Sequence, residues 1–271
     1  MPERFEATLF ADPGRPRISA RVLLVAAHPD DETVGVGAQL HRCDDLFLLH
    51  LTDGAPRNLA DARRHGFEDA PSYAAARARE LRAALAAGSV SAARFSWGLP
   101  DQGLASVLPE LCRRLAAFIQ WLRPDALITH AYEGGHPDHD SAALGCQVAL
   151  SALPLGRRPR RLEFAGYHAA TGAPRWGRFV TEDASELTIP LTGAEQRRKA
   201  AMLACFTTQA AVLADAPRTQ ERLRPAPEHD FRHPPHPGPL WYERMGWGVT
   251  GVEWRNRAAE ALAERSTGPA C

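Results

Sequence analysis

The sequence lacks long hydrophobic runs. No apolar run in the 271 residues approaches the roughly 20 residues that a membrane-spanning helix needs. The N-terminal stretch MPERFEATLFADPGRPR has no apolar segment of the kind that a secretory signal contains. We therefore expect no membrane span and a cytoplasmic protein.

The sequence also lacks an excess of charge of either sign. Lys and Arg together number 32, as do Asp and Glu, so the formal net charge is zero. This balance argues against nucleic acid or an anionic membrane as the main partner, because both favour basic surfaces. The five cysteines are scattered and form no CxxC pair, which is typical of reduced thiols and excludes a disulfide framework.

What the sequence does contain is an alternation of strands and helices. The apolar runs and helical patterns predict strands over 22–27, 45–54, 93–103 and 125–131, and helices over 32–43, 71–88, 106–123 and 136–153. Such alternation indicates βαβ units. We expect a Rossmann-like α/β/α fold of three layers with a mostly parallel sheet.

The composition changes near residue 216. Seven prolines between Pro217 and Pro239 argue against regular structure in that stretch. Aromatic residues follow at 241–254, and we expect them to pack a tail onto the domain in preference to stacking on a sugar. We predict a main domain over 1–215 and an irregular extension over 216–271, packed on the same domain and ending in a helix over about 253–265.

Two clusters of histidine and aspartate follow predicted strands. They are HPDD at 28–31 and HPDH at 136–139. In parallel sheets, ligands bind beyond the carboxyl ends of the strands, so both clusters can reach one crevice. Imidazole and carboxylate together suit Zn²⁺, which in catalytic sites has three protein ligands and an open position for water.

The spacing within each cluster separates the roles of its members. Asp30 and Asp31 are adjacent in an extended loop and point in different directions, so one can hold metal while the other faces the bound water. His136 and His139 are three residues apart at a helix start, which places them on the same side.

With these motifs the sequence resembles the PIG-L/LmbE-like metal-dependent deacetylases. The resemblance covers about residues 20–155. It rests on AHPDDE and HPDH, supported by TDG at 52–54, RxxEL at 77–81 and PDxGL at 100–104. It implies an LmbE-like fold and removal of acetyl groups from N-acetylglucosamine attached to inositol, phosphatidylinositol, malate or other aglycones. The implied partner is a small N-acetylated sugar or glycoconjugate.

The resemblance also implies roles for single residues. His28, Asp31 and His139 would be the metal ligands, with Asp30 as general base and a protonated His136 as the electrophilic or acidic partner. The implied cofactor is Zn²⁺, although such sites also accept Fe²⁺ or Co²⁺.

Four further residues are candidates with open alternatives. Arg77 and Asp101 are candidate substrate contacts. Equally, Arg77 suits a solvated helix residue paired with Glu80, and Asp101 suits a turn. Glu32 either supports the metal ligands or is a favourable charge in the first turn of a helix. Asp138 is a candidate to orient a neighbouring histidine.

The main prediction is therefore metal-dependent hydrolysis of an N-acetyl amide on an amino sugar or its conjugate. A metal phosphoesterase is the alternative enzyme, but it usually needs a second set of ligands. An amidase for a non-sugar amide also stays open. The single GxG at 35–37 does not match a dinucleotide fingerprint. A non-catalytic binding module has no use for Asp30.

Overall fold

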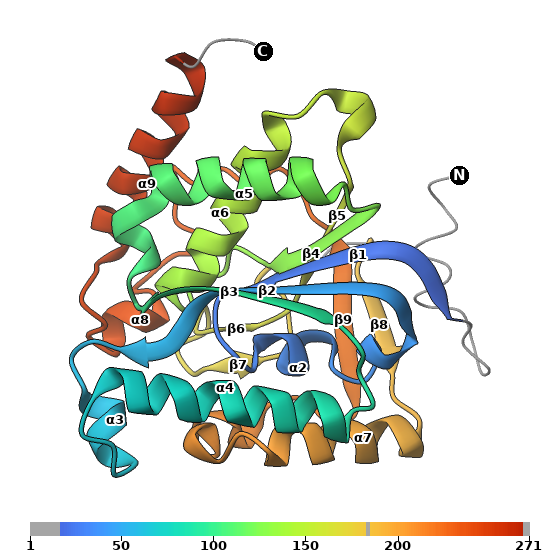
Figure 1. The fold of residues 1–271 in the computed structure, drawn as a ribbon. Coiled ribbons are helices and arrows are strands. Elements are labelled where there is room, and N and C mark those ends of the chain that lie inside the picture. The colour runs from blue at the N-terminus through green and yellow to red at the C-terminus, as the bar shows by residue number, and fades with distance from the viewer. Residues whose placement is uncertain (1–16, 183–184, 268–271) are drawn as a thin grey trace.

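A seven-stranded sheet with helices on both faces forms the centre of the molecule (Figure 1). The computed structural model describes residues 17–182 and 185–267. The strands of this sheet are β1 (Ile18–Ala26), β2 (Cys43–Pro56), β3 (Ala93–Asp101), β4 (Ala126–His130), β5 (Arg160–Phe164), β8 (Leu187–Pro190) and β9 (Gln220–Pro225). A separate hairpin consists of β6 (Tyr167–His168) and β7 (Arg175–Trp176).

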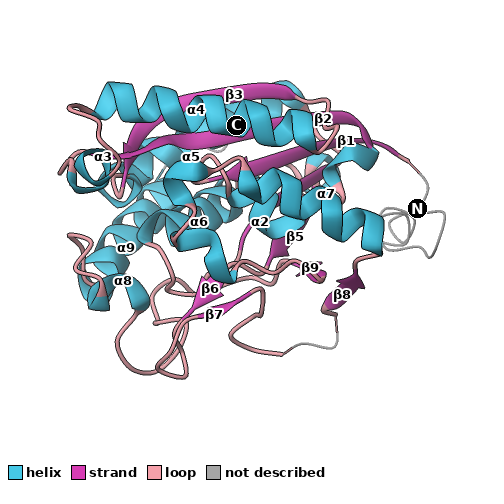
Figure 2. Ribbon diagram, turned by 90° about the horizontal axis from the view of Figure 1, so that it is seen from below, coloured by secondary structure: helices cyan, strands magenta, loops and turns pink. Residues whose placement is uncertain are grey.

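Helices cover the sheet as two outer layers. One layer holds α5 (Leu108–Leu122), α6 (Pro137–Ser151) and α9 (Gly251–Thr267); the other holds α2 (Asp31–Val36), α4 (Ala70–Ala87) and α7 (Gly193–Ala204) (Figures 1 and 2). Short helices α3 (Ala60–Arg64) and α8 (Trp241–Arg244) lie at one end of the sheet. Among the described residues no helix combines the length and apolar character that a membrane crossing requires.

The strand order places a switch point beside β1. The order is β3-β2-β1-β4-β5-β9-β8, and β1 to β5 are mutually parallel, whereas β8 and β9 pair antiparallel. The chain leaves β1 toward β2 on one side and returns to β4 on the other, so a crevice opens beyond the ends of β1 and β4. The predicted three-layer fold with a mostly parallel sheet is confirmed.

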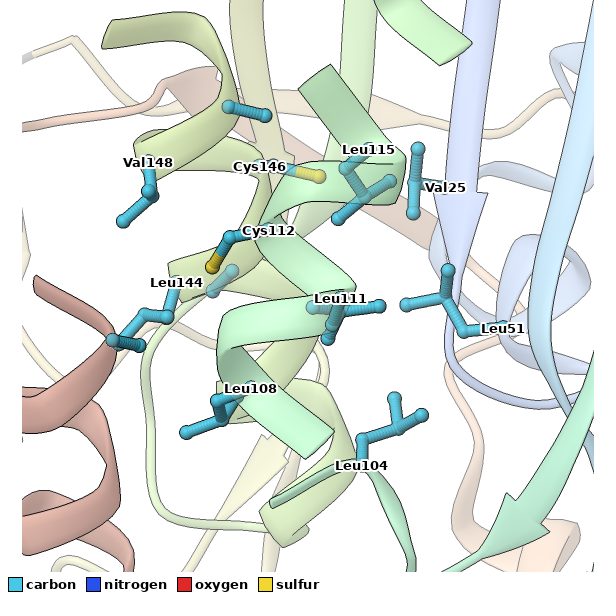
Figure 3. Packing of buried hydrophobic residues seen from close by; sticks show 14 of the residues in the cluster. Val25, Leu51, Leu104, Leu108, Leu111, Cys112, Leu115, Leu144, Cys146 and Val148 are labelled. Carbon is cyan, nitrogen blue, oxygen red and sulfur yellow. The ribbon is translucent and has the colours of Figure 1, made fainter. Parts of the chain in front are cut away.

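Each face of the sheet has its own hydrophobic core. Because side chains alternate along a strand, Leu23 and Val25 of β1 face α5 and α6, while Val22 and Leu24 face the opposite layer. Figure 3 shows the first core, where side chains of α5, α6, β1 and β2 gather in one cluster. Burial on both faces explains why these strands are continuous apolar runs.

The helix predicted over 32–43 is wrong in length. The structure has α2 over Asp31–Val36, a 3₁₀ turn at Leu40–Arg42, and β2 already at Cys43. The segment is rich in Thr, Val and Gly, which are poor helix formers. A Cβ at Gly37 would lie 2.6 Å from the backbone oxygen of Thr33, so the chain turns there only because this residue is glycine.

The expectation of no regular structure in the proline-rich stretch is also wrong in part. β9 occupies Gln220–Pro225 and joins the main sheet between β5 and β8. Its prolines cause no conflict, because Pro225 is the last residue of the strand and Pro217 precedes it. The division into 1–215 and 216–271 stays a prediction, although β9 links both parts through one sheet.

The C-terminal aromatic residues pack mainly inward. Tyr242 and Trp254 are fully buried in the first core, and the indole N–H of Trp254 donates to Pro137 O and Ser141 Oγ of α6. The expected packing therefore holds for these two side chains. Trp247 is different, because it is half-buried and lines the pocket described below.

Candidate metal centre

The first motif forms a tight loop between β1 and α2. The backbone N–H of His28 donates to Asp31 Oδ2 (2.6 Å), and the N–H of Asp30 donates to His28 O (3.0 Å). His28, Asp30 and Asp31 are all buried. The loop thus fixes one imidazole and two carboxylates directly beyond the end of β1.

The second motif begins α6 beyond the end of β4. His136 is the N-cap residue, and its Nδ1 accepts a hydrogen bond from the backbone N–H of Asp138 (3.1 Å). Pro137 lies in the first turn, where its missing N–H costs little. The rings of His136 and His139 are 5.1 Å apart between centroids, so both point to the same side.

The two loops meet at three side chains that carry possible metal ligands. His28 Nδ1 is 3.3 Å from His139 Nε2, which is 3.1 Å from Asp31 Oδ1; Asp31 Oδ2 is 3.3 Å from His28 Nδ1. Ligands about 2.0–2.2 Å from a tetrahedral Zn²⁺ are separated from one another by about 3.4 Å. The triangle His28, Asp31 and His139 therefore fits one divalent cation.

Carboxylates also surround the other side of the His28 ring. His28 Nε2 lies 3.1 Å from Asp101 Oδ1 and 3.3 Å from Asp138 Oδ2. Burial lowers the pKa of His28, but Asp101, with Asp138 and Asp31, outweighs it and raises the pKa well above its usual value. Such a concentration of buried negative charge suits a cation.

Asp138 is held firmly in this position. Its carboxylate accepts hydrogen bonds from the backbone N–H groups of Gln102 (2.6 Å) and Leu104 (3.0 Å), and the residue is completely buried. Asp138 lies beside His28 of the other motif. That Asp138 orients this histidine stays a prediction.

His130, the last residue of β4, lies behind the triangle. Its ring stacks on His139 with centroids 4.1 Å apart, and its Nε2 accepts from the backbone N–H of Ala27 (3.0 Å) and lies 3.3 Å from Asp31 Oδ2. His130 thus supports two members of the triangle. Asp31, His130 and His139 also form a candidate metal-binding group of their own.

The side chain of Arg77, on α4, contacts the loop of the first motif. It is 3% exposed, and its guanidinium donates to Asp30 Oδ2 (3.0 Å), Gly54 O (2.9 Å) and Pro29 O (3.2 Å). The alternative of a solvated Arg77 paired with Glu80 is wrong, because the carboxylate of Glu80 accepts hydrogen bonds from the hydroxyls of Thr207 and Thr208 and the N–H of Thr208.

Burial and Arg77 act in opposite directions on Asp30. Burial raises the pKa of Asp30 and Arg77 lowers it, and burial prevails, so that the pKa lies at about 8. Asp30 is therefore a buried carboxyl group with one cationic partner, next to the three-donor triangle. The structure brings it into the same pocket as His28 and His139.

Glu32 is buried in the first turn of α2 and has two hydrogen-bonding neighbours. It is completely buried, accepts from Thr33 Oγ1 (2.6 Å) and lies 3.0 Å from His50 Nε2 on β2. It lies in the first turn of α2, so both alternatives stay open. His50 is itself hydrogen-bonded through this contact.

His136 and Asp101 lie side by side at the pocket. His136 Nε2 is 3.5 Å from Asp101 Oδ1, and Asp101 faces both His28 and His136. Burial, then His28, lowers the pKa of His136 well below its usual value, which favours a neutral imidazole. This direction opposes the expectation of a protonated His136. Because Nδ1 accepts from Asp138 N–H, the neutral ring carries its proton on Nε2.

These side chains form the floor of an open pocket. Its free volume, counted out to the mouth, is about 700 Å³. The other lining side chains include polar ones, namely Asp61, Gln102 and Gln209, and apolar or aromatic ones, namely Val34, Phe164, Tyr167, Trp176, Val212, Leu213 and Trp247. Most of these lining residues belong to no motif, and no local pattern in the sequence points to Trp176 or Val212.

The fold and the site together define an α/β protein with one candidate centre for a divalent cation at its switch point. Residues 23–150 match the family model described as "PIG-L: GlcNAc-PI de-N-acetylase". The resemblance seen in the sequence is thus confirmed over this segment of the chain.

Individual proteins are similar to this chain in sequence or in fold. Over 243 residues the chain is 29% identical to a 1D-myo-inositol 2-acetamido-2-deoxy-alpha-D-glucopyranoside deacetylase of Nakamurella multipartita, covering 72% of this chain and 82% of that protein. Its fold is similar to that of the A40926 pseudoaglycone deacetylase Dbv21 (TM-score 0.60, 17% identity, 77% of this chain and 97% of that chain).

The same fold also occurs in a protein with another reaction. The structure of GalB, the 4-carboxy-2-hydroxymuconate hydratase of Pseudomonas putida, aligns with a TM-score of 0.53 and 17% identity over 78% of this chain and 98% of that chain. The fold alone therefore does not determine the reaction, and the argument for function must come from the site.

Proposed function

We propose that this protein is a zinc-dependent deacetylase that hydrolyses the N-acetyl amide of an amino sugar or its conjugate, releasing acetate and a free amine. The observation that carries the proposal is the triangle of side chains His28, Asp31 and His139 from two distant loops, with a second acidic group, Asp30, in the same pocket. The match to the PIG-L family model and the deacetylase activity of the similar Nakamurella protein support the same reaction.

His28, Asp31 and His139 would hold the metal, as two neutral imidazoles and one carboxylate. A divalent cation bound there would polarise the amide carbonyl and lower the pKa of bound water toward about 7. Zn²⁺ suits this donor set, and Fe²⁺ or Co²⁺ would also be accepted.

Asp30 is the proposed general base. Its carboxylate removes a proton from the attacking water as the new C–O bond forms, and the leaving nitrogen receives a proton when the C–N bond breaks. Arg77 positions this carboxylate through its hydrogen bond to Oδ2. Because Arg77 also binds two backbone oxygens, Asp30 is held in one orientation.

His136 is the proposed donor to the carbonyl oxygen. Its Nε2 proton can hydrogen-bond to that oxygen as negative charge develops there, which stabilises the transition state. Asp101 lies close enough to orient the ring from the side. In this scheme His136 acts as an electrophilic partner in its neutral form.

Polar groups at the mouth suit sugar hydroxyls. Asp61, Gln102 and Gln209 come from three different segments and line the same pocket. A small N-acetylated sugar or glycoconjugate is therefore the proposed substrate. Asp101 and Arg77 complete the polar surface, although the guanidinium of Arg77 already has three partners.

The test combines metal analysis with product release. Protein purified without added metal should hold about one divalent ion per chain, and incubation with N-acetylglucosamine conjugates should release acetate. Asp30→Asn should lower kcat by roughly 10²-fold or more while metal stays bound. Asp44→Asn, at an exposed carboxylate paired with Arg17, is the matched control and should change neither.

Two results would contradict the proposal. Acetate release that is unaffected by Asp30→Asn would refute the assigned base. Release of phosphate from phosphate esters, with no acetate from any amide, would support the phosphoesterase alternative instead.

A further inference from the structure

The hairpin of β6 and β7 lies outside the main sheet, yet two of its side chains line the pocket (Figure 2). Tyr167 and Trp176 pair across the hairpin, with ring centroids 4.5 Å apart. The ring of Tyr167 is also 5.4 Å from the ring of His139. Each strand has only two residues, and so short a ladder is marginally stable by itself. Contacts from outside the hairpin are therefore needed to hold these rings at the pocket.

A single carboxylate holds the base of the hairpin. Glu133 Oε2 accepts a hydrogen bond from the backbone N–H of Gly166, immediately before β6 (3.2 Å). Glu133 Oε1 accepts one from the N–H of Val180, which follows β7 (3.2 Å). The N–H of Gly177 donates to Gly166 O (2.7 Å) and closes the base between them. The two oxygens of one side chain thus bind both ends of the segment that contains the hairpin.

Glu133 is itself fixed close to the proposed reacting groups. It is 4% exposed and lies three residues before His136, in the loop that follows β4. Its backbone N–H donates to Asp140 Oδ1 of α6 (3.2 Å). The same loop touches the hairpin once more, because a Cβ at Gly135 would lie 2.0 Å from Tyr167 O. This loop therefore joins the start of α6 to the hairpin.

Removal of this carboxylate should release the hairpin without unfolding the sheet. The chain on either side of the hairpin is held independently. Ahead of it, the N–H of Ala165 donates to Arg222 O (3.1 Å); beyond it, Arg224 of β9 donates to Thr181 O (2.9 Å). Both bonds remain when Glu133 is replaced. The effect should therefore be confined to the segment between them, which carries the two rings.

We infer that Glu133 is a positioning residue: its carboxylate holds the hairpin of β6 and β7 so that Tyr167 and Trp176 contact the bound substrate. The inference rests on the proposed function, because it assigns Glu133 a part in binding the substrate of that reaction. In this scheme Glu133 neither holds the metal nor transfers a proton. Substrate binding should therefore depend on Glu133, and the bond-breaking step should not.

Steady-state kinetics separates binding from chemistry. With methyl N-acetylglucosaminide, Glu133→Gln should raise KM roughly tenfold and change kcat less than about threefold, because the neutral amide has one acceptor oxygen for two N–H groups. Glu133→Asp is a second variant, which keeps the charge but is too short to reach both N–H groups, and it should also raise KM. Glu195→Gln is the matched control and should change neither constant, since the buried carboxylate of Glu195 binds Thr192 at the start of α7.

A double variant tests whether the effect passes through the hairpin. Trp176→Ala removes one of the two rings and should itself raise KM. Adding Glu133→Gln should then raise KM less than about threefold further, because Glu133 positions a smaller contact surface. A full tenfold increase in both backgrounds would overturn the inference, since Glu133 would then act independently of the hairpin.

Hydrogen exchange separates this inference from the proposed reaction, because it requires no turnover. In Glu133→Gln the N–H groups of Gly166 and Val180 should exchange at least roughly tenfold faster, while those of Leu24 in β1 and Ile128 in β4 keep their rates. Unchanged exchange at the hairpin, equal acceleration in the sheet, or an unchanged KM would overturn the inference. Faster exchange confined to the hairpin, in a protein that releases no acetate, would contradict the proposed function alone.

Discussion

At the scale of single residues, the contacts of Arg77 determine how Asp30 can act. One guanidinium donates three hydrogen bonds. Two reach Asp30 and Pro29 in the loop after β1, and the third reaches Gly54 near the end of β2. The side chain is buried, so no water replaces these bonds if it is removed. Arg77 is thus better described as a positioning residue than as a free substrate contact.

Replacing Arg77 by Met should therefore affect kcat more than KM. We expect kcat to fall by roughly 10²-fold, because Asp30 loses its orientation and its neighbouring positive charge, with KM changed less than about threefold. Steady-state kinetics on an N-acetylated sugar provides the measurement. Arg79→Met, at an exposed arginine of the same helix, is the control. A large rise in KM at unchanged kcat would instead support a substrate contact.

At the scale of elements, one buried ion pair joins α2, α7 and β9. Lys199 is the only lysine of the chain, and neither it nor Glu221 is exposed. Its Nζ donates to Glu221 Oε1 and to Val34 O at the end of α2, both at 2.8 Å. Glu221 Oε1 also accepts from Ala38 N–H. The pair thus fixes the end of the helix that begins with Asp31.

Breaking this pair should destabilise the fold. Lys199→Met leaves Glu221 buried without its cation, which should cost roughly 3–5 kcal/mol in the free energy of unfolding. In the double variant Lys199→Met/Glu221→Gln the remaining group is neutral and can still accept from Ala38, so most of the loss should be recovered. Urea unfolding measures both. An equal free energy of unfolding for the single variant and the parent would show that the ion pair does not stabilise the fold.

The elements also show where sequence reasoning succeeded and failed. Strands such as β1 and β4 were predictable because burial on both faces makes them continuous apolar runs. The length of α2 and the existence of β9 were not, because contacts from distant segments, such as Glu221 to Ala38, determine them. Propensity and proline content carry no information about such partners.

The residues of the candidate site were likewise predictable from the sequence only in part. The meeting of His28, Asp31 and His139 was predictable, because the carboxyl ends of neighbouring parallel strands meet and both motifs follow such ends. Trp176 and Val212 were not, since they come from a short hairpin and a turn that only the folded chain brings to the pocket. Motifs therefore point to the chemistry, while long-range packing completes the pocket.

At the scale of the whole molecule, the switch point unites these features. β1 and β4 are neighbours in the sheet, so two loops about a hundred residues apart in sequence form one floor. The C-terminal segment contributes Trp247 to the lining of the pocket, and the hairpin of β6 and β7 contributes Tyr167 and Trp176. One sheet thus positions the reacting groups and the surfaces that select the substrate.

The most direct measurement of the central claim is the anomalous scattering of zinc in crystals of this protein grown with the metal. The account predicts one strong peak per chain, about 2.0–2.2 Å from a ring nitrogen of His28, a ring nitrogen of His139 and a carboxylate oxygen of Asp31. Crystals of the His139→Ala variant should lack that peak, and those of His233→Ala, at an exposed histidine, should keep it. Zinc bound elsewhere, or a peak that persists without His139, would contradict the account.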